Sequence, residues 1–88
     1  MRFQFDPAKA ASNLKKHGVS FADAEGVFYD PLAIHLADPD YTDEERFAAV
    51  GMGSAGKILT VVYTLRGNEI RIISVRRATR KEVKDYEG

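Results

Sequence analysis

The stretch ILTVVYTLRGNEIRIISVR (residues 58–76) contains two runs rich in β-branched residues on either side of a Gly-Asn pair. Such residues favour strands because their side chains pack well on a pleated surface. Glycine and asparagine tolerate the positive φ angles that a tight hairpin turn requires. The stretch therefore predicts two antiparallel strands, over residues 58–65 and 69–76, in the middle of a sheet.

Three further strands are expected upstream, over residues 2–5, 32–36 and 46–50, and apolar and polar residues alternate in the first two of them. In residues 32–36 the alternation predicts leucine and isoleucine side chains facing the core and His35 facing outward. The glycine-rich stretch 51–56 matches a phosphate-binding pattern, but a strand follows it where such sites need a helix. We therefore interpret it as a hairpin turn.

Helix end signals predict three helices. The first begins at Asp6-Pro7 and ends at Gly18, the second runs from Ser20 to Pro31, and the third begins at Thr79. Thr79 and Glu82 have the spacing of a capping box. The expected order is β-α-α-β-β-β-β-α, an α+β fold with an antiparallel sheet, two N-terminal helices and a short C-terminal helix.

Length and composition limit the possible functions. With 88 residues we expect a single domain spanning 1–88, too small for a large enclosed active site. The chain has no cysteine and only two histidines, so we expect no disulfide, no metal site and no cofactor. No segment has the length and apolarity of a membrane span or the pattern of a leader, which predicts a cytoplasmic protein without a membrane partner.

The net charge is zero, but the charges are unevenly distributed. Residues 1–45 carry four basic and nine acidic side chains, whereas residues 46–88 carry nine basic and four acidic ones. If the C-terminal elements cluster in space, they provide a local positive field for phosphate groups. The alternative is that mixed charges only keep the surface soluble.

Several of the charged residues are candidates for catalysis or for anion binding. His17 ends a helix, where the dipole favours the protonated imidazole; it acts either in proton transfer or as a helix cap. Strand alternation predicts Arg76 on the face of Ile72 and Ser74, and Arg71 on the opposite face together with Arg77. These arginines either bind an anion or satisfy nearby helix carbonyls and acids. Similarly, Glu45 beside Arg46 is either a base next to a phosphate ligand or a surface ion pair.

Two terminal segments, FDPAKAASNLKKHGVSF (residues 5–21) and IRIISVRRAT (residues 70–79), resemble the start and end of the BrnT family. Between them lie FYDP (28–31), DPD (38–40), EER (44–46) and VGMGS (50–54), in the order that this family shows. BrnT proteins are toxins of bacterial type II toxin–antitoxin pairs with a RelE-like ribonuclease fold. The resemblance covers nearly the whole chain.

The resemblance implies an RNA endonuclease that inhibits translation and works without metal, by attack of the RNA 2′-hydroxyl on the adjacent phosphorus. The implied catalytic residues are His17, Glu45, Arg46, Arg71 and Arg76. Contacts to the RNA are expected from Lys15, Lys16, Arg77, Arg80 and Lys81. The resemblance also implies a BrnA-like antitoxin with a ribbon-helix-helix DNA-binding domain, so that operator DNA is bound only through this partner.

Two alternatives remain open from the sequence. The chain can be a catalytically weak module that holds the antitoxin and takes part in operon autoregulation. It can also be a metal-dependent nuclease that uses the alternating carboxylates of Asp38, Asp40 and Asp43. The antitoxin-binding module would not depend on the basic residues for its function, in contrast to the metal-free enzyme. The metal-dependent nuclease would require a metal ion for cleavage.

Overall fold

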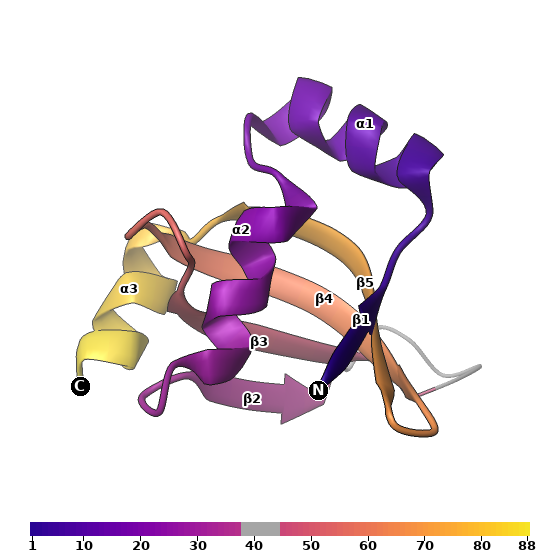
Figure 1. Ribbon diagram of the computed structural model, residues 1–88. Helices are drawn as coiled ribbons and strands as arrows, with labels where there is room; N and C mark the ends of the chain where they lie inside the picture. Colours follow the sequence, from indigo (N-terminus) through magenta and orange to yellow (C-terminus); the bar gives the residue numbers. More distant parts are fainter. Residues whose placement is uncertain (38–44) are drawn as a thin grey trace.

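The computed structural model describes residues 1–37 and 45–88. The elements confirm the predicted order and the α+β class (Figure 1). The first half contains β1 (Arg2–Gln4), α1 (Pro7–His17), α2 (Phe21–Glu25), the 3-10 helix η1 (Gly26–Tyr29) and β2 (Ile34–Ala37). The second half contains β3 (Phe47–Met52), β4 (Ile58–Arg66), β5 (Glu69–Arg77) and α3 (Arg80–Glu87).

The predicted ends of the first helix and the predicted start of the third are confirmed, whereas the second α-helix ends earlier than predicted, at Glu25, and continues as the 3-10 helix η1 to Tyr29. The side chain of Asp6 accepts a hydrogen bond from the Ala8 backbone N–H at 2.9 Å, and Pro7 is the first residue of α1. Gly18 ends α1 with a φ of 70°, a left-handed conformation that glycine adopts without a steric cost. At α3, Thr79 and Glu82 form both hydrogen bonds of the capping box.

The sheet has the strand order β1-β5-β4-β3-β2. Strands β2 to β5 form the expected antiparallel meander, but β1 pairs with β5 in parallel, from Arg2 opposite Glu69 to Gln4 opposite Arg71. The sheet is therefore mixed, not purely antiparallel. A short parallel edge strand is possible because the helices and the whole meander separate β1 from β5 along the chain.

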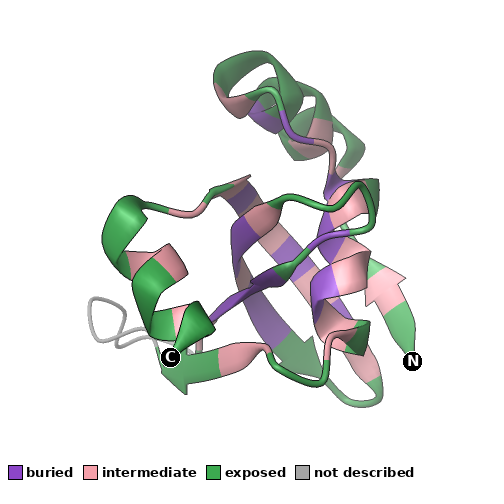
Figure 2. Ribbon diagram, turned by 90° about the vertical axis from the view of Figure 1, so that its left-hand side faces the viewer, coloured by how far each residue is buried: buried purple, intermediate pink, exposed green. Residues whose placement is uncertain are grey.

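One face of the sheet carries the core. Helices α2 and η1 lie across this face (Figure 1), and their buried residues Phe21, Ala24 and Val27 belong to the same cluster as Leu59, Val61, Ile72 and Val75 of the sheet. Figure 2 shows that α3 and most of α1 are exposed or half-buried, in contrast to the central strands. None of the described helices is long and apolar enough to cross a bilayer.

The glycine-rich stretch is a hairpin turn between β3 and β4, as predicted. Its backbone packs directly against the end of α2, where the Ser54 N–H donates to the carbonyl oxygen of Asp23 at 3.0 Å. A Cβ atom on Gly26 would lie 2.4 Å from the Ser54 nitrogen. A Cβ atom on Gly53 of the stretch would likewise lie 2.8 Å from the Asp23 carbonyl oxygen. Both glycines allow close packing between the turn and α2, which gives this stretch a structural role.

The prediction for β2 is wrong about which side chains face the core. Leu32 and Leu36 are 70% and 61% exposed and only Ile34 of the three is half-buried, whereas His35, although exposed, has its Nδ1 2.8 Å from the hydroxyl oxygen of the core residue Tyr63. The His35 ring also contacts Phe28. Alternation identified the strand correctly, but the aromatic cluster under η1, and not hydrophobicity, selects the inward face.

Candidate nucleic-acid interface

A β-bulge in β5 brings the candidate arginines to one face. Val62 lies opposite Ser74 and Tyr63 lies opposite Ile72, so that Ile73 is the extra residue. The bulge shifts the alternation by one position. Arg71 and Arg76 therefore share a face, which corrects the predicted separation of these two residues.

We call this surface the basic face and define it by six residues, three from each of the two central strands: Thr60, Val62, Thr64, Arg71, Ser74 and Arg76. It lies opposite the core face, because Leu59, Val61 and Val75 alternate with its members and are buried under α2 and η1. Ile72 is also in the core, not beside Arg76 as predicted. The accessible polar groups of this face are the two guanidinium groups and the Ser74 hydroxyl, because Thr60 and Thr64 are buried.

Arg46 lies directly before β3, and strand alternation extended by this one residue places it on the side of the basic face. It directly precedes Phe47, whose ring stacks on Tyr63 on the core side with 5.5 Å between ring centroids. Alternation therefore directs the Arg46 side chain toward the opposite side. Glu45, one residue earlier, is exposed.

Helix α1 lies along the part of β5 that β1 leaves free. β1 pairs only with residues 69–71, so the backbone of Val75 lacks a strand partner on that edge. Asn13 takes this place: its Nδ2 donates to the Val75 carbonyl at 2.9 Å, and its Oδ1 accepts from the Val75 N–H at 3.2 Å. Nδ2 also donates to the Val19 carbonyl at 3.1 Å. One buried side chain thus fixes α1 to the sheet edge.

A shallow hollow of about 180 Å³ forms between α1 and β5 as a result. Its polar lining includes Lys9, Lys16 and His17 from α1 and Ser74 from the basic face. Lysine and histidine side chains around a hydroxyl group are suited to binding a phosphate. The structure therefore brings two of the predicted residues, Lys16 and His17, next to the strand that carries Arg71 and Arg76.

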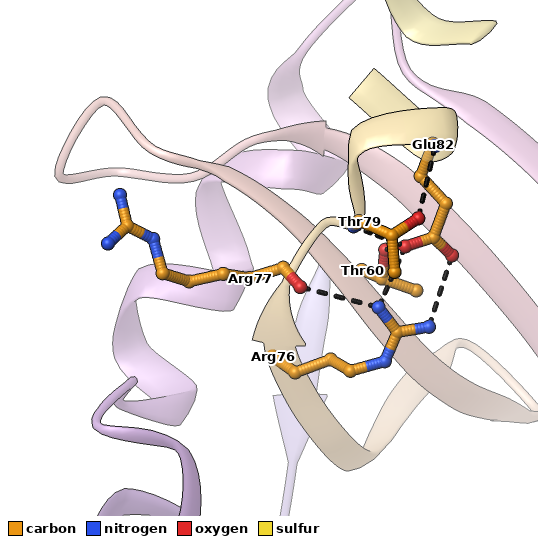
Figure 3. Close-up of polar contacts among 5 residues, drawn as sticks. All are labelled: Thr60, Arg76, Arg77, Thr79 and Glu82. Atoms are coloured by element: carbon orange, nitrogen blue, oxygen red, sulfur yellow. Dashed lines mark hydrogen bonds and ion pairs between the residues drawn. The ribbon is translucent and has the colours of Figure 1, made fainter. Parts of the chain in front are cut away.

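Two residues beyond Ser74 on β5, Arg76 forms an ion pair with Glu82 of α3 (Figure 3). Arg76 Nη1 and Nη2 donate to the two carboxylate oxygens at 2.7 and 3.1 Å. The carboxylate also accepts from the Thr60 hydroxyl at 3.0 Å and from the Thr79 backbone N–H at 2.8 Å. Hydrogen bonds from Arg76, followed by those from Thr79 and Thr60, lower the pKa of Glu82 from 4.5 to about 2 despite partial burial. The same hydrogen bond raises the pKa of Arg76.

This pKa predicts how acid acts on stability. Because the pKa of Glu82 is lower in the folded protein than in the unfolded chain, its stabilising contribution is present above about pH 4.5 and is lost as the pH falls toward about 2. We expect the difference in the free energy of unfolding between wild type and Glu82→Gln to be constant near neutral pH and to shrink in this acid range. Urea unfolding at a series of pH values measures it, with the exposed Glu87→Gln as a control for charge removal from α3. A difference that stays unchanged down to about pH 2 would contradict the prediction.

Other predicted residues lie apart from these groups. Arg77 pairs with Leu59 and therefore points to the core side of the sheet at its exposed end, and Figure 3 shows its side chain directed away from the Arg76–Glu82 pair. Lys15 is exposed and does not line the hollow. Arg80 and Lys81 are exposed in the first turn of α3.

The metal hypothesis concerned Asp38, Asp40 and Asp43, which lie outside the described residues. Within the described part of the chain, no group of three or more His, Asp or Glu side chains is arranged to hold a metal ion.

Residues 5–82 match the family model described as "Ribonuclease toxin, BrnT, of type II toxin-antitoxin system". The chain belongs to the BrnT family. It is also similar to the crystal structure of the Brucella abortus ribonuclease toxin BrnT, with a TM-score of 0.69 and 28% sequence identity over 91% of this chain and 99% of that one. Among curated proteins no match is found. The comparisons confirm both the resemblance to BrnT and the α+β fold.

Membership of the BrnT family implies an antitoxin partner, since the family consists of ribonuclease toxins from type II toxin–antitoxin systems.

Within this BrnT-family fold, sequence reasoning missed Asn13, Lys9 and Glu82 as parts of the interface. A signal for Asn13 existed, because it lies on the same helical face as Ala10 and His17. Glu82 was recognised only as a helix cap, because its pairing with Arg76 depends on how α3 folds back on the sheet.

Proposed function

We propose that this chain is a cytoplasmic RNA endonuclease toxin, a single domain over residues 1–88, that inhibits translation by cutting RNA without a metal ion. The proposal rests on one observation. Arg71 and Arg76 lie on the same face of β5, and the hollow that contains His17 lies beside this strand, in a BrnT-family fold. Metal-free cleavage needs an RNA held in position and positive charge around its phosphate. A small open surface of this kind is sufficient for both.

In the proposed reaction the 2′-oxygen attacks the neighbouring phosphorus while the bond to the 5′-oxygen breaks. The products are a 2′,3′-cyclic phosphate and a free 5′-hydroxyl. Arg46, Arg71 and Arg76 stabilise the charge that develops on the phosphate oxygens. One group must accept the 2′-hydroxyl proton and one must protonate the leaving oxygen; His17 and Glu45 are the candidates, and His17 has the support of lying in the hollow beside Ser74.

Further basic residues extend the surface for the RNA strand. We assign weaker contacts with the phosphate backbone to Lys15, Lys16, Arg77, Arg80 and Lys81. Of these, Lys16 has the strongest support because it lines the hollow. The antitoxin is proposed to be a BrnA-like protein that neutralises the toxin and carries a ribbon-helix-helix domain, so that operator DNA is bound through the antitoxin.

The test is cleavage of a defined RNA by purified, antitoxin-free protein in EDTA. We expect cuts that persist in EDTA and leave cyclic-phosphate ends, since no step requires a metal. Cleavage that depends on added Mg²⁺ or Mn²⁺ would contradict the proposal. A folded protein that binds its antitoxin but cuts no RNA would favour the alternative of a regulatory antitoxin-binding module.

A further inference from the structure

We infer that Glu82 is a positioning residue for Arg76: it holds one edge of the guanidinium so that the other edge is presented as a two-donor fork to an RNA phosphate. The inference rests on the proposed function and goes one step beyond it. It assigns α3, which contributes no proposed catalytic group, a role in orienting the site.

Glu82 is fixed independently of Arg76. Its carboxylate accepts hydrogen bonds from Thr60 on β4 and from the Thr79 backbone, and its own N–H donates to the Thr79 hydroxyl at 3.2 Å. The far end of α3 is also attached, because the Tyr86 hydroxyl donates to Asp30 at 2.6 Å. The carboxylate is therefore a rigid acceptor for any side chain that binds to it.

The pairing leaves part of the Arg76 guanidinium available. Of its five N–H donors, two bind Glu82 and one, on Nη1, binds the Arg77 carbonyl at 3.3 Å. The remaining two are the Nε–H and the outer N–H of Nη2, which are parallel and point to the same side of the planar group. Within the described part of the chain neither donates a hydrogen bond, and the side chain is 41% exposed.

This fork has the geometry that arginine uses for bidentate binding of phosphate. An unpaired arginine would have to give up rotamer freedom when RNA binds, and its fork would take many directions. Glu82 removes this freedom before binding. Thr60, which lies directly opposite Arg76 across the strands, links the pair to the basic face.

Kinetics of Glu82→Gln test the inference, because glutamine keeps the shape and can still cap α3 while losing the charge and one acceptor oxygen. We expect kcat for RNA cleavage to fall about 10-fold or more, since small misplacement of a catalytic group is costly, while KM changes little. The matched control is Glu87→Gln, an exposed residue of the same helix, which should match the wild type.

The decisive comparison uses the Arg76→Ala background. If Glu82 acts through Arg76, Glu82→Gln should cause no further loss there. A loss of the same size in both backgrounds would overturn the inference and leave Glu82 as a helix cap alone. Cleavage that is unchanged or faster in the single Glu82→Gln variant would also overturn it, because the carboxylate would then be neutral for the site or compete with the phosphate.

A binding readout separates this inference from the proposed cleavage activity. The probe is an oligonucleotide with the sequence of the RNA used in the cleavage assay, in which hydrogen replaces every 2′-hydroxyl so that it cannot be cut. The NMR signal of the Arg76 Nε–H, assigned by its absence in Arg76→Lys, should shift in the wild type and not in Glu82→Gln. If the signal shifts although the protein cuts no RNA, the cleavage proposal is wrong and the inference about Glu82 stands. If RNA is cut but the signal does not shift, the inference about Glu82 is wrong and the cleavage proposal stands.

Discussion

Replacing Arg76 by alanine is expected to lower kcat for RNA cleavage by about 10²-fold to 10³-fold, the loss typical of removing one group that stabilises developing charge. The guanidinium is oriented by a carboxylate, and two of its N–H donors have no partner among the residues that the structure describes. Gel-based cleavage of a defined RNA under saturating substrate measures the effect. Binding to the antitoxin and the far-ultraviolet circular dichroism spectrum should show that the fold is retained.

Arg76→Lys distinguishes charge from geometry in the same assay. Lysine keeps the positive charge but has no planar fork, so we expect most of the loss to persist. The control for loss of one positive charge is Lys57→Ala, in the exposed turn between β3 and β4, which should cleave at the rate of the wild type. Wild-type cleavage by Arg76→Ala would remove Arg76 from the proposed site.

Replacing Asn13 by alanine is expected to lower the free energy of unfolding by about 3 kcal/mol or more. The substitution leaves the Val75 N–H, the Val75 carbonyl and the Val19 carbonyl without their partner, and each buried polar group without a hydrogen bond costs about 1 to 3 kcal/mol. This is a large share of the stability of a small domain. Equilibrium unfolding in urea measures the change.

Leu14→Ala is the matched control on the same helix, because Leu14 is 51% exposed and its truncation removes little buried surface. Asn13→Asp is expected to be at least as destabilising as Asn13→Ala at neutral pH, because it places a buried carboxylate oxygen against the Val19 and Val75 carbonyl oxygens. A loss below about 1 kcal/mol for Asn13→Ala would show that water or a shift of α1 replaces the amide. The hollow with Lys16 and His17 would then not depend on Asn13.

Local features of the fold could be predicted from the sequence because the residues that cause them are neighbours along the chain. The Asp6 and Thr79 caps and the left-handed Gly18 each depend on contacts within a few residues. The hairpin between β4 and β5 depends on Gly67 and Asn68 and on the β-branched residues that flank them. The sequence motifs also predicted membership of the BrnT family, which the match of residues 5–82 to the family model confirms.

The arrangement of the candidate site could be predicted only in part. Arg71, Arg76, Lys16 and His17 were chosen from the sequence as candidates, but strict alternation put the two arginines on opposite faces. The bulge at Ile73 places both arginines on the same face, and the residue type at position 73 gives no signal from which the bulge could be predicted. Similarly, the exposed Leu36 and the contact of His35 with the core residue Tyr63 show that the two-residue period of a strand does not by itself decide which face is buried.

The sequence by itself determined the element order, the ends of α1, the start of α3, the hairpin turns and the family, because these depend on local backbone preferences and on motifs. The tertiary structure alone decided which groups meet: Asn13 with the β5 backbone, 62 residues away, and Glu82 with Arg76 and Thr60. Such contacts depend on strand register and on how helices pack against the sheet. Register and packing are set by the whole core, and no short stretch of sequence contains them.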